Sequence, residues 1–413
     1  MNTLVFIPTP LEGELDIITS KSYAHRALIV SSLAKGRSEI VNLPFSEDVV
    51  ATQEALKQFG VNINKNVIES KDFVYDGKPI HCFASGSTLR MLIPVAMALF
   101  DRVIFSGIPR LFERPLDVYE TLFENKIKRL NKEQIEVHGP ITNHVFHVDG
   151  SKSSQFVSGL LMMSPLLNRN VEINMMHDIT SESYIEMTME VMNHFGVQLH
   201  KKNNRIYIDQ NQTYQARSIT IEGDYSQAAF FLVAGLIGNP IHVKGILPHS
   251  KQGDKKIIDI LIEMGGNLTW TEAGVLSSPS VTKGIQIDLK DIPDLGPILM
   301  ILASLSKGKT VFLNVDRLQY KESDRLHTMI HILDQLGVIS YYIENTLTIE
   351  GVVSLKGNIT LSSEDDHRIA MAIAIASIRS EGIITLTQAE AVKKSYPEFY
   401  DVFQSLGGHI HES

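Results

Sequence analysis

Cationic side chains recur where helices are predicted to begin. Lys21 and Arg26 fall in the first turn or so of one predicted helix, and Arg90 lies just inside another. His367 and Arg368 open a third. The N-terminal end of a helix carries partial positive charge, so each cation there is unfavourable by roughly 0.3–1 kcal/mol. Several such cations in a chain of net charge −9 indicate that a bound anion supplies the missing charge.

Further cations extend this set. Lys321 and Arg325 are spaced i, i+4, which predicts that they share one face of a helix and repel each other. Arg114, in FERP, and Lys394, in KKSYP, are expected in loops. Any one of these residues could be an ordinary solvated surface residue. As a set they predict a site for phosphate and carboxylate groups.

Three carboxylates fall among these cations: Asp294, Glu322 and Asp366. A site with phosphate-binding cations and two carboxylates can bind a polyanion and move protons. The neighbours Lys321 and Glu322 could instead form a surface ion pair, which would contribute little to stability.

Other kinds of site find little support. Ser153 and Ser154 could include a hydrolase nucleophile, but no G-x-S-x-G motif surrounds them, and no G-x-x-x-x-G-K-[ST] loop suggests ATP binding. The single cysteine, Cys82, rules out a cysteine-based zinc site and an internal disulfide. No metal is therefore expected. Three helical histidines are expected to be surface or packing residues: His25, His327 and His331.

The composition is that of a globular protein. Of 413 residues, 44% are hydrophobic and 21% are charged, enough for one large or two medium domains. The acidic net charge argues against nucleic acid and anionic membranes as partners. The start, MNTLVFIPTP, does not resemble a signal peptide, and the longest apolar runs fall short of the roughly 20 residues of a membrane span. A cytoplasmic protein is expected.

One sequence pattern recurs along the chain: a predicted amphipathic helix, a large apolar residue, a glycine and a predicted strand. A glycine at this point predicts a left-handed helix C-cap. A degenerate copy, TLFENKI, has Asn125 at the cap position. The spacing predicts six repeats of roughly 69 residues. The five glycines are Gly60, Gly196, Gly265, Gly337 and Gly407.

A second sequence pattern repeats with the same spacing as the first. A polar cluster precedes a helix that is apolar nearly all round, as in AHRALIVSSLA after 20–22 and QAAFFLVAGLIG after 224–226. A helix that is apolar on every face is buried. Each repeat is thus predicted to hold one buried helix, one exposed helix and about four strands. The polar clusters could bind ligands, or their Ser and Asp residues could merely cap the helices.

An ordered set of short sequence fragments along the chain resembles the EPSP synthase family, within the enolpyruvyl transferases. The resemblance runs essentially from end to end and rests on an ordered set of fragments rather than on any one. The fragments are SKSYAHRAL, SGSTLR, FERP, DGSKSSQF, SESYIEMT, EGDYSQAAFFL, QGD, IPD, KESDRL, DHRIAMA and KKSYP.

The resemblance implies an α/β (α+β) fold: a two-domain inside-out α/β barrel, the enolpyruvyl transferase fold. Six βαβαββ repeats, three per domain, would surround buried parallel helices. Residues 1–18 and 222–413 would form a discontinuous C-terminal-type domain, and residues 19–221 an N-terminal-type domain. The active site would lie in the interdomain cleft, and the domains would close on substrate.

The same resemblance implies the reaction and the residues. The enolpyruvyl group of phosphoenolpyruvate would pass to the 5-hydroxyl of shikimate 3-phosphate, in chorismate and aromatic amino acid biosynthesis. Shikimate 3-phosphate would contact Lys21, Ser22, Arg26, Ser153, Ser154, Gln155, Ser181, Tyr184, Asp294 and Lys321. Phosphoenolpyruvate would contact Lys21, Gly86, Arg114, Gln155, Arg325, His367, Arg368 and Lys394.

By analogy, Asp294 handles the proton of the 5-hydroxyl, Glu322 handles the proton at C3, and Lys21 assists and holds the phosphate. No cofactor is required, and a monomer is expected. Two departures from the family pattern stand out. Gln319 replaces a common Arg, with Arg317 two residues earlier, and Ala84-Ser85 precedes Gly86 where Asn-Ala or Asn-Ser is common.

Alternative functions fit less well. A transferase acting on UDP-N-acetylglucosamine would share fold and donor, but typically has a reactive cysteine near the phosphoenolpyruvate site, and the region around FERP has none. A non-catalytic protein that binds phosphorylated metabolites would not need Asp294 and Glu322. A structural repeat protein would not need the charges at the ends of buried helices.

Overall fold

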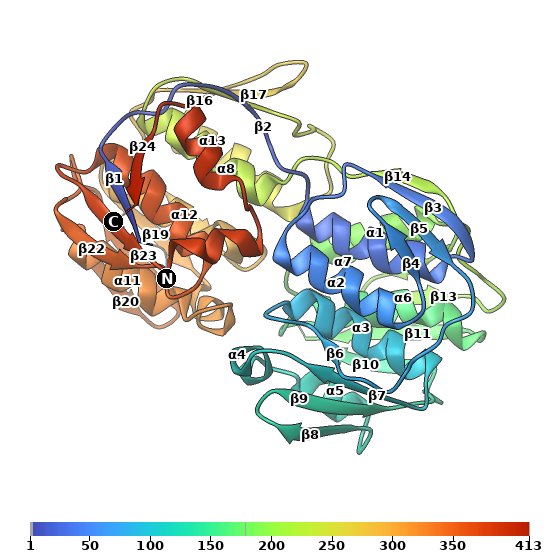
Figure 1. Cartoon of the computed structure of the whole chain (residues 1–413). Helices are drawn as coiled ribbons and strands as arrows, with labels where there is room; N and C mark the ends of the chain where they lie inside the picture. The colour runs from blue at the N-terminus through green and yellow to red at the C-terminus, as the bar shows by residue number, and fades with distance from the viewer. Residues whose placement is uncertain (1–2, 178, 413) are drawn as a thin grey trace. The chain divides into compact units, whose positions relative to one another are not determined.

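The structure is a computed structural model that describes residues 3–177 and 179–412 (Figure 1). These residues divide into two compact units. The central unit runs from Ser20 to Ile221 in the middle of the sequence. The terminal unit combines the segment up to Thr19 with the segment from Glu222 onward.

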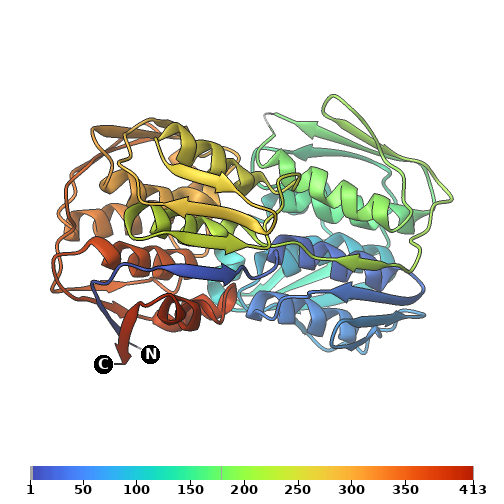
Figure 2. The same ribbon diagram turned by 90° about the horizontal axis from the view of Figure 1, so that it is seen from above.

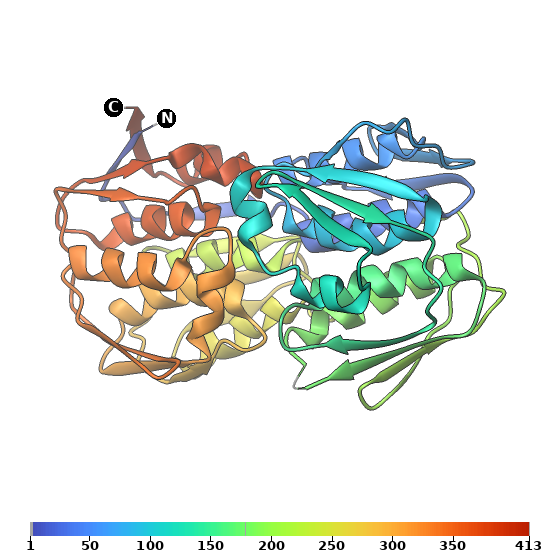
Figure 3. The same cartoon turned by 90° about the horizontal axis from the view of Figure 1, so that it is seen from below.

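The central unit contains three four-stranded sheets of one pattern, a parallel pair followed by two antiparallel neighbours. In Figure 3 the teal strands β7, β8 and β9 lie in front of part of this unit's helices. In spatial order the sheets are β14 (Ser218–Thr220), β3 (Gly36–Val41), β5 (Val67–Ser70), β4 (Asn62–Asn64); β6 (Ile80–His81), β7 (Arg102–Ser106), β9 (Gln134–His138), β8 (Ile127–Asn131); and β10 (Val145–Asp149), β11 (Val171–Met176), β13 (Arg205–Ile208), β12 (His200–Lys202).

The terminal unit repeats this sheet pattern three times. The sheets are β2 (Gly13–Asp16), β15 (Ile241–Lys244), β17 (Gly274–Ser278), β16 (Asn267–Trp270); β18 (Gln286–Asp288), β19 (Lys309–Leu313), β21 (Thr346–Glu350), β20 (Ser340–Ile343); and β22 (Ile359–Ser362), β23 (Ile384–Thr387), β1 (Leu4–Ile7), β24 (His409–Glu412). Six sheets of one pattern confirm the six predicted repeats.

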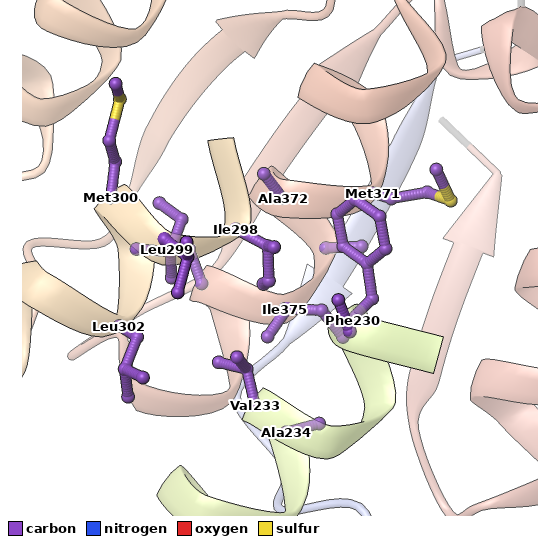
Figure 4. Close-up of a cluster of buried hydrophobic side chains, with 14 of the residues drawn as sticks. Phe230, Val233, Ala234, Ile298, Leu299, Met300, Leu302, Met371, Ala372 and Ile375 are labelled. Carbon is purple, nitrogen blue, oxygen red and sulfur yellow. The ribbon is translucent and has the colours of Figure 1, made fainter. Parts of the chain in front are cut away.

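Each repeat supplies one inner helix whose residues are buried on nearly all sides. The central unit has α1 (Lys21–Leu33), α3 (Gly86–Leu99) and α6 (Ser154–Met163); the terminal unit has α8 (Tyr225–Ile237), α10 (Gly296–Ser304) and α12 (His367–Ala376). Every residue of α8 is buried, as its all-round apolar sequence predicts. Side chains from α8, α10 and α12 meet in one core, among them Phe230, Val233, Ile298, Leu299, Met371 and Ile375 (Figure 4).

The second helix of each repeat buries only part of its surface. Amphipathic sequence explains this: in α7, apolar residues such as Ile185, Val191 and Met192 are buried while the acidic residues remain at the surface. These helices are α2 (Glu47–Gln58), α5 (Asp117–Leu122), α7 (Glu182–His194), α9 (Lys256–Glu263), α11 (Arg325–Gln335) and α13 (Phe399–Ser405). Shorter helical turns are α4 (Pro109–Glu113), η1 (Ser164–Leu167), η2 (Gly253–Lys255), η3 (Pro293–Leu295), η4 (Val315–Tyr320), η5 (Ser377–Arg379) and η6 (Ala389–Lys394).

The predicted left-handed caps are present in all six repeats. Gly60, directly after the C-cap of α2, has φ +86°, and Asn125 in the degenerate copy has φ 59°. The other four glycines have φ between 79° and 96°. Only glycine takes this conformation without steric cost, and asparagine is among the residues that tolerate it. The left-handed residue ends the outer helix and turns the chain back toward the sheet.

Polar residues at the starts of the inner helices act as N-caps. Ser20, Ser85, Ser153, Asp224 and Asp366 each accept a hydrogen bond from a backbone N–H of the following turn. The capping interpretation of these clusters is therefore confirmed for these five residues. The cap brings the side chains that follow it to the N-terminal end of each inner helix.

The first described strands pair with late parts of the chain. β1 lies between β23 and β24, with Leu4 opposite Leu386 and Glu412. β2 runs parallel to β15, and β14 runs parallel to β3 of the central unit. The blue strand β1 therefore lies among the red elements (Figures 1 and 2). No helix within residues 3–177 and 179–412 combines the length and apolarity that a membrane span requires.

Candidate active site

Arg325 lies at the centre of a buried charge cluster in the terminal unit. It is the first residue of α11 and is 0% exposed. Its Nε and Nη2 donate to Asp366 at 2.7 and 3.2 Å, Nη1 donates to Asp294 at 2.7 Å, and Nη2 donates to Glu322 at 2.6 Å. Burial alone would lower the pKa of Arg325, but the three carboxylates raise it. The cluster thus joins Arg325 to both carboxylates that were predicted to move protons.

Asp294, in η3 just before α10, is surrounded by cations. Lys321 Nζ lies 3.2 Å from its Oδ1, and Arg368 Nη2 lies 3.6 Å from its Oδ2. Burial would raise the pKa of Asp294, but Lys321, Arg368 and Arg325 hold it well below its usual value. Asp294 is therefore ionised at neutral pH. The cations that hold it in this state could equally bind an anion.

The prediction that Lys321 and Arg325 share one helical face is wrong. Lys321 has φ −92° and ψ −160°, an extended conformation, and precedes α11. The helix begins only after Asp324, whose Oδ1 accepts from the backbone N–H of His327 at 3.2 Å. The two cations nevertheless meet, because both contact Asp294. Tertiary packing around a shared carboxylate brings them together, rather than i, i+4 spacing.

The N-terminal end of α12 carries His367 and Arg368, as predicted. Asp366 caps the helix, accepting from the Arg368 N–H at 2.9 Å, and also bonds Arg325. His367 is buried, with its Nδ1 4.0 Å from Asp366 Oδ1. Arg368 Nη1 donates to the Ser226 carbonyl at 3.4 Å, while its buried Nε has no hydrogen-bond partner among the described residues. Arg368 therefore keeps a donor for a ligand.

Two other cations singled out in the sequence, Lys394 and Arg317, belong to the terminal unit and bond to residues outside the Arg325 cluster. Lys394, in η6, donates to the carbonyl and the carboxylate of Asp365 at 2.6 and 2.7 Å. Arg317, in η4, donates to the Lys290 carbonyl. Burial lowers the pKa of Arg317, and the charge of Asp294 opposes that shift. The hydrogen bond of Arg317 is to the backbone of Lys290 rather than to a carboxylate of the cluster.

Sequence reasoning did not single out Asp254 as a site residue. This carboxylate is buried, forms a hydrogen bond with the Ser226 hydroxyl, and interacts with Asp294 and Arg368. Burial, followed by the negative charge of Asp294, raises its pKa to about 6. The fragment QGD contains Asp254, but no spacing in the sequence connects it with Asp294 or Arg368.

In the central unit, Arg26 is a buried cation without a carboxylate partner. It is 2% exposed, and no carboxylate of the described residues forms an ion pair with it. Nε donates to Thr188 Oγ1 at 2.7 Å, Nη1 to the Ser22 carbonyl at 2.7 Å, and Nη2 to Ser158 Oγ at 3.2 Å and the Tyr184 carbonyl at 3.0 Å. Burial lowers its pKa to about 10, so it is charged at neutral pH. An anionic ligand would supply the missing counter-charge.

Lys21, the first residue of α1, pairs with a residue that sequence reasoning missed. Its Nζ lies 2.9 Å from Asp48 Oδ2, in the first turn of the outer helix α2. The sequence SEDVV indicates a helix whose first turn is acidic, but it does not indicate that Asp48 pairs with Lys21. Lys21 thus has a protein counter-ion, so the need for a bound anion rests on the other cations of the set.

Gly86 and Arg114, both predicted site residues, lie against each other. Gly86 opens α3, and Arg114 follows α4. A Cβ at position 86 would lie 2.7 Å from Arg114 Nη1 and 2.8 Å from its Cζ. Glycine is therefore what lets the guanidinium approach the N-terminal end of α3. Arg114 is 8% exposed, and its Nε has no hydrogen-bond partner among the described residues.

Gln155 links the first turns of α3 to the start of α6. Its Oε1 accepts from Arg90 Nη1 at 3.0 Å, and its Nε2 donates to Ser87 Oγ at 3.0 Å. Ser153 caps α6 by accepting from the Gln155 N–H at 3.3 Å, and Ser154 is the first residue of the helix. Arg90, one of the cations misplaced for a helix start, therefore fixes this junction.

Ser181 and Tyr184 lie at the start of α7. Ser181 is its N-cap, with a left-handed φ of 56°, and its carbonyl accepts from the Tyr184 N–H at 3.1 Å. The Tyr184 carbonyl accepts from Arg26, whose Cζ lies 5.7 Å from the centre of the tyrosine ring. These contacts bring Ser22, Arg26 and Tyr184 together, with Ser181 one turn away.

Cys82 does not take part in the clusters described above. Cys82 is buried at 0% exposure, and burial raises the pKa of its thiol. Among residues 3–177 and 179–412, no group of three or more His, Cys, Asp or Glu side chains is arranged to hold a metal ion.

Comparison with known proteins identifies the family. Residues 5–403 match the family model of EPSP synthase (3-phosphoshikimate 1-carboxyvinyltransferase). The chain belongs to the EPSP synthase family. It is 42% identical to the 3-phosphoshikimate 1-carboxyvinyltransferase of Clostridium kluyveri, over 98% of this chain and 97% of that protein. It is 39% identical to the protein of that name from Clostridium novyi, over 100% of this chain and 99% of that one.

Solved structures support the enolpyruvyl transferase fold. The EPSP synthase of Acinetobacter baumannii superposes with a TM-score of 0.83 at 23% identity, covering 100% of both chains. The enolpyruvyl transferase NikO from Streptomyces tendae superposes with a TM-score of 0.80 at 14% identity, covering 100% of this chain and 99% of that one. At these identities the likeness concerns the fold. The predicted fold class and family are confirmed.

Proposed function

We propose that this member of the EPSP synthase family transfers the enolpyruvyl group of phosphoenolpyruvate to the 5-hydroxyl of shikimate 3-phosphate and releases inorganic phosphate. Family membership over almost the whole chain supports this reaction. The structural observation that carries it is the cluster in which Asp294 and Glu322 both bond Arg325, with Lys321 and Arg368 beside Asp294. Such a cluster can hold anions and move protons.

Shikimate 3-phosphate is assigned to the acceptor set given by the family resemblance. The buried charge of Arg26, without a carboxylate partner among the described residues, supports the assignment of an anion near α1 and α7. The hydroxyls of nearby serines could bind the remaining oxygens. The set comprises Lys21, Ser22, Arg26, Ser153, Ser154, Gln155, Ser181, Tyr184, Asp294 and Lys321.

Phosphoenolpyruvate is assigned to the donor set. The contact between Gly86 and Arg114 supports it, because a guanidinium beside helical N–H groups suits a phosphate or carboxylate. The buried Nε atoms of Arg114 and Arg368, which lack hydrogen-bond partners among the described residues, support it further. The set comprises Lys21, Gly86, Arg114, Gln155, Arg325, His367, Arg368 and Lys394.

The proposed reaction has two steps. In the first, the 5-oxygen forms a bond to C2 of phosphoenolpyruvate, loses its proton toward Asp294, and C3 gains a proton handled by Glu322. In the second, C3 loses a proton, the C2–O bond to phosphate breaks, and inorganic phosphate leaves. Because cations keep Asp294 ionised, its negative charge is available beside the positive charge that develops at C2. Lys21 assists and holds the phosphate.

The experiment is phosphate release from phosphoenolpyruvate with shikimate 3-phosphate, with UDP-N-acetylglucosamine, or with no acceptor. Release only with shikimate 3-phosphate is expected. Release only with the sugar nucleotide would contradict the acceptor assignment and keep the donor assignment. No release with either would favour a protein that only binds its ligands.

Two variants test the catalytic assignments. Asp294→Ala and Glu322→Ala should each abolish turnover while the protein still folds, which circular dichroism would check. Thr310→Val is a matched control, since Thr310 is buried in β19 and its hydroxyl has no hydrogen-bond partner among the described residues. Near-normal turnover in both alanine variants would overturn the assignment.

We further propose a cytoplasmic monomer in which residues 1–18 with 222–413, and residues 19–221, act as two domains that together bind the substrates. The assignment of both substrates to residues from both segments supports this arrangement. Small-angle X-ray scattering should show a smaller radius of gyration with substrates than without. An unchanged radius would contradict domain closure.

A further inference from the structure

Four buried polar side chains form a continuous hydrogen-bonded chain across three helices of the central unit. His25 Nδ1, on α1, lies 2.8 Å from Thr52 Oγ1, on α2. Thr52 Oγ1 lies 2.6 Å from Thr88 Oγ1, on α3, and Thr88 Oγ1 donates to Ser85 Oγ at 2.8 Å. All four residues are at most 1% exposed. A buried polar chain of this kind is costly unless its members are satisfied, so it fixes the helices that carry it.

The direction of each hydrogen bond follows from proton counting. Thr88 uses its hydroxyl hydrogen on Ser85, so in the contact between the two threonines Thr52 must donate. The hydrogen of Thr52 is then used, so His25 Nδ1 must carry a hydrogen and donate to Thr52. Ser85 accepts from both the hydroxyl and the N–H of Thr88. Its own hydroxyl hydrogen is therefore left for an acceptor outside the chain.

His25 is a neutral donor in this chain. Burial, followed by the charges of Lys21 and Arg26, lowers its pKa well below the usual value. Its Nε2 is buried and has no hydrogen-bond partner among the described residues, which agrees with a ring that carries its hydrogen on Nδ1. The structure gives His25 a geometric role and no titration near neutral pH.

The chain lies one helical turn deeper than an ion pair between the same two helices. Lys21 pairs with Asp48 at 2.9 Å, and His25 and Thr52 each follow these residues by one turn. Helices α1 and α2 are thus joined by a charged pair at their N-terminal ends and by a neutral pair below it. Both pairs reach Thr88 on α3: its Oγ1 lies 2.6 Å from Thr52 Oγ1 and 3.5 Å from the Asp48 carbonyl oxygen. These contacts therefore fix α1 and α2 relative to the start of α3.

The end of the chain reaches the contact between Gly86 and Arg114. Ser85 caps α3, and Gly86 is the first residue of that helix. Arg114 lies against Gly86 with a buried Nε that has no hydrogen-bond partner among the described residues. A buried cation thus lies at the N-terminal end of a helix of 14 residues, and Ser85, which caps that helix, keeps one hydroxyl hydrogen. An anion is the ligand that all three would bind.

We propose that His25, Thr52 and Thr88 are positioning residues for the donor anion, holding Ser85 and Gly86 in the arrangement that binds phosphoenolpyruvate. The inference rests on the proposed function for the identity of that anion. None of the three touches substrate in this account, and each acts through Ser85 or through the spacing of α1, α2 and α3.

The two sides of α1 give this inference a specific signature. Arg26, next to His25 in sequence, faces the opposite way and is held by Ser158 on α6 and by Thr188 and the Tyr184 carbonyl on α7. These contacts share no residue with the chain from His25 to Ser85. Breaking the chain should therefore weaken donor binding while acceptor binding persists. A general loss of stability would affect both.

The test compares Thr52→Val with Thr52→Ser in steady-state phosphate release, with each substrate varied in turn. Valine removes the hydroxyl and leaves His25 and Thr88 without their partner; serine restores it. Thr52→Val should raise KM for phosphoenolpyruvate roughly 5- to 30-fold. KM for shikimate 3-phosphate should change less than about twofold, as should both constants in Thr52→Ser and in the control Thr310→Val. Should Thr52→Val fail to fold, Thr88→Val removes the next hydroxyl and carries the same expectation.

Equal changes in both KM values, no change in either, or failure of Thr52→Ser to restore donor binding would overturn the inference. Wild-type turnover tests the proposed function separately. If the wild type binds phosphoenolpyruvate without turnover, the same ratios are read from its Kd measured by calorimetry, with shikimate 3-phosphate present. A wild type that does not bind phosphoenolpyruvate would overturn both.

Discussion

Replacing Arg325 with Met would remove the buried cation on which Asp294, Glu322 and Asp366 converge. Methionine retains much of the apolar stem, so the main loss is charge and hydrogen bonding rather than volume. Asp366 is the residue most affected, because it is 0% exposed and bonds Arg325 through both oxygens. We expect the terminal unit to lose stability through this uncompensated carboxylate.

The expected magnitude follows from what remains buried. Removing one partner of a buried ion pair typically costs about 3–5 kcal/mol, a large fraction of the roughly 5–15 kcal/mol that stabilises a domain. For a unit of this size each kcal/mol corresponds to about 2–4 °C in Tm, so we expect a decrease of roughly 6–20 °C. The effect should exceed that of any exposed arginine in the same unit.

The chain contains a built-in probe for this measurement. Its one tryptophan, Trp270, lies in β16 of the terminal unit and is 40% exposed. Urea and thermal unfolding followed by its fluorescence therefore report on the unit that contains Arg325. Arg379→Met is the matched control, since Arg379 is exposed at the end of η5 and should change stability by less than about 0.5 kcal/mol.

A Tm for Arg325→Met within about 2 °C of wild type would refute this reasoning. It would mean that desolvating the guanidinium costs as much as its three carboxylate contacts return. Equal losses in Arg325→Met and Arg379→Met would also refute it, since burial would then make no difference.

Further predictions concern single positions. Cations hold the pKa of Asp294 below its usual value, so its ionised form contributes stability that is complete above about pH 4 and is lost as pH falls through the lower folded pKa. The substitution Asp294→Asn should therefore lower the free energy of unfolding in urea by roughly 1–3 kcal/mol at pH 7, and by less below pH 4. Gly407→Ala should lower the free energy of unfolding by about 1 kcal/mol, because its φ is +90° and the space around its Cβ is open. Gly60→Ala should lower it further, because its Cβ would lie 2.7 Å from Val74 Cγ2, and equal losses of stability in the two variants would rule out a crowding effect. Cys82 should resist a thiol reagent such as dithionitrobenzoate at pH 8 in the native protein and react after unfolding in guanidinium chloride; rapid native labelling would contradict its burial.

Much of the fold could be predicted because its signals are local. The left-handed residue at Gly60 is specified by the helix before it and the strand after it, and Asn125 satisfies the same requirement without glycine. The apolar sequence of α8 contains its own burial. The pairing of β2 with β15 and of β14 with β3 has no such signal, because strand pairing depends on residues far apart in the chain.

The site was predicted less completely for the same reason. The anion hypothesis singled out Arg26, but not the residues that hold it, because Ser158 and Thr188 are far away in sequence. The spacing of Lys321 and Arg325 suggested a shared helix face, whereas a capping aspartate starts the helix between them. Local spacing thus identified two residues that meet, but for the wrong reason, because Lys321 and Arg325 meet at Asp294 and not on one face of a helix.

The position of β1 also orders events during synthesis. Residues 20–221 leave the ribosome early and contain all strands of the central unit, so this unit can fold while the rest is made. β1 and β2 emerge before it, yet their partners are β15, β23 and β24. At about 5–20 residues per second, the segment after residue 221 takes roughly 10–40 s to synthesise.

During that interval the two early strands have unsatisfied edges. β2, with the sequence GELD, carries Glu14 and Asp16, and acidic side chains discourage pairing with other chains. β1, with the sequence LVFI, has no such protection. The nascent chain thus exposes the apolar strand β1 until β23 and β24, which flank it in the sheet, have been made.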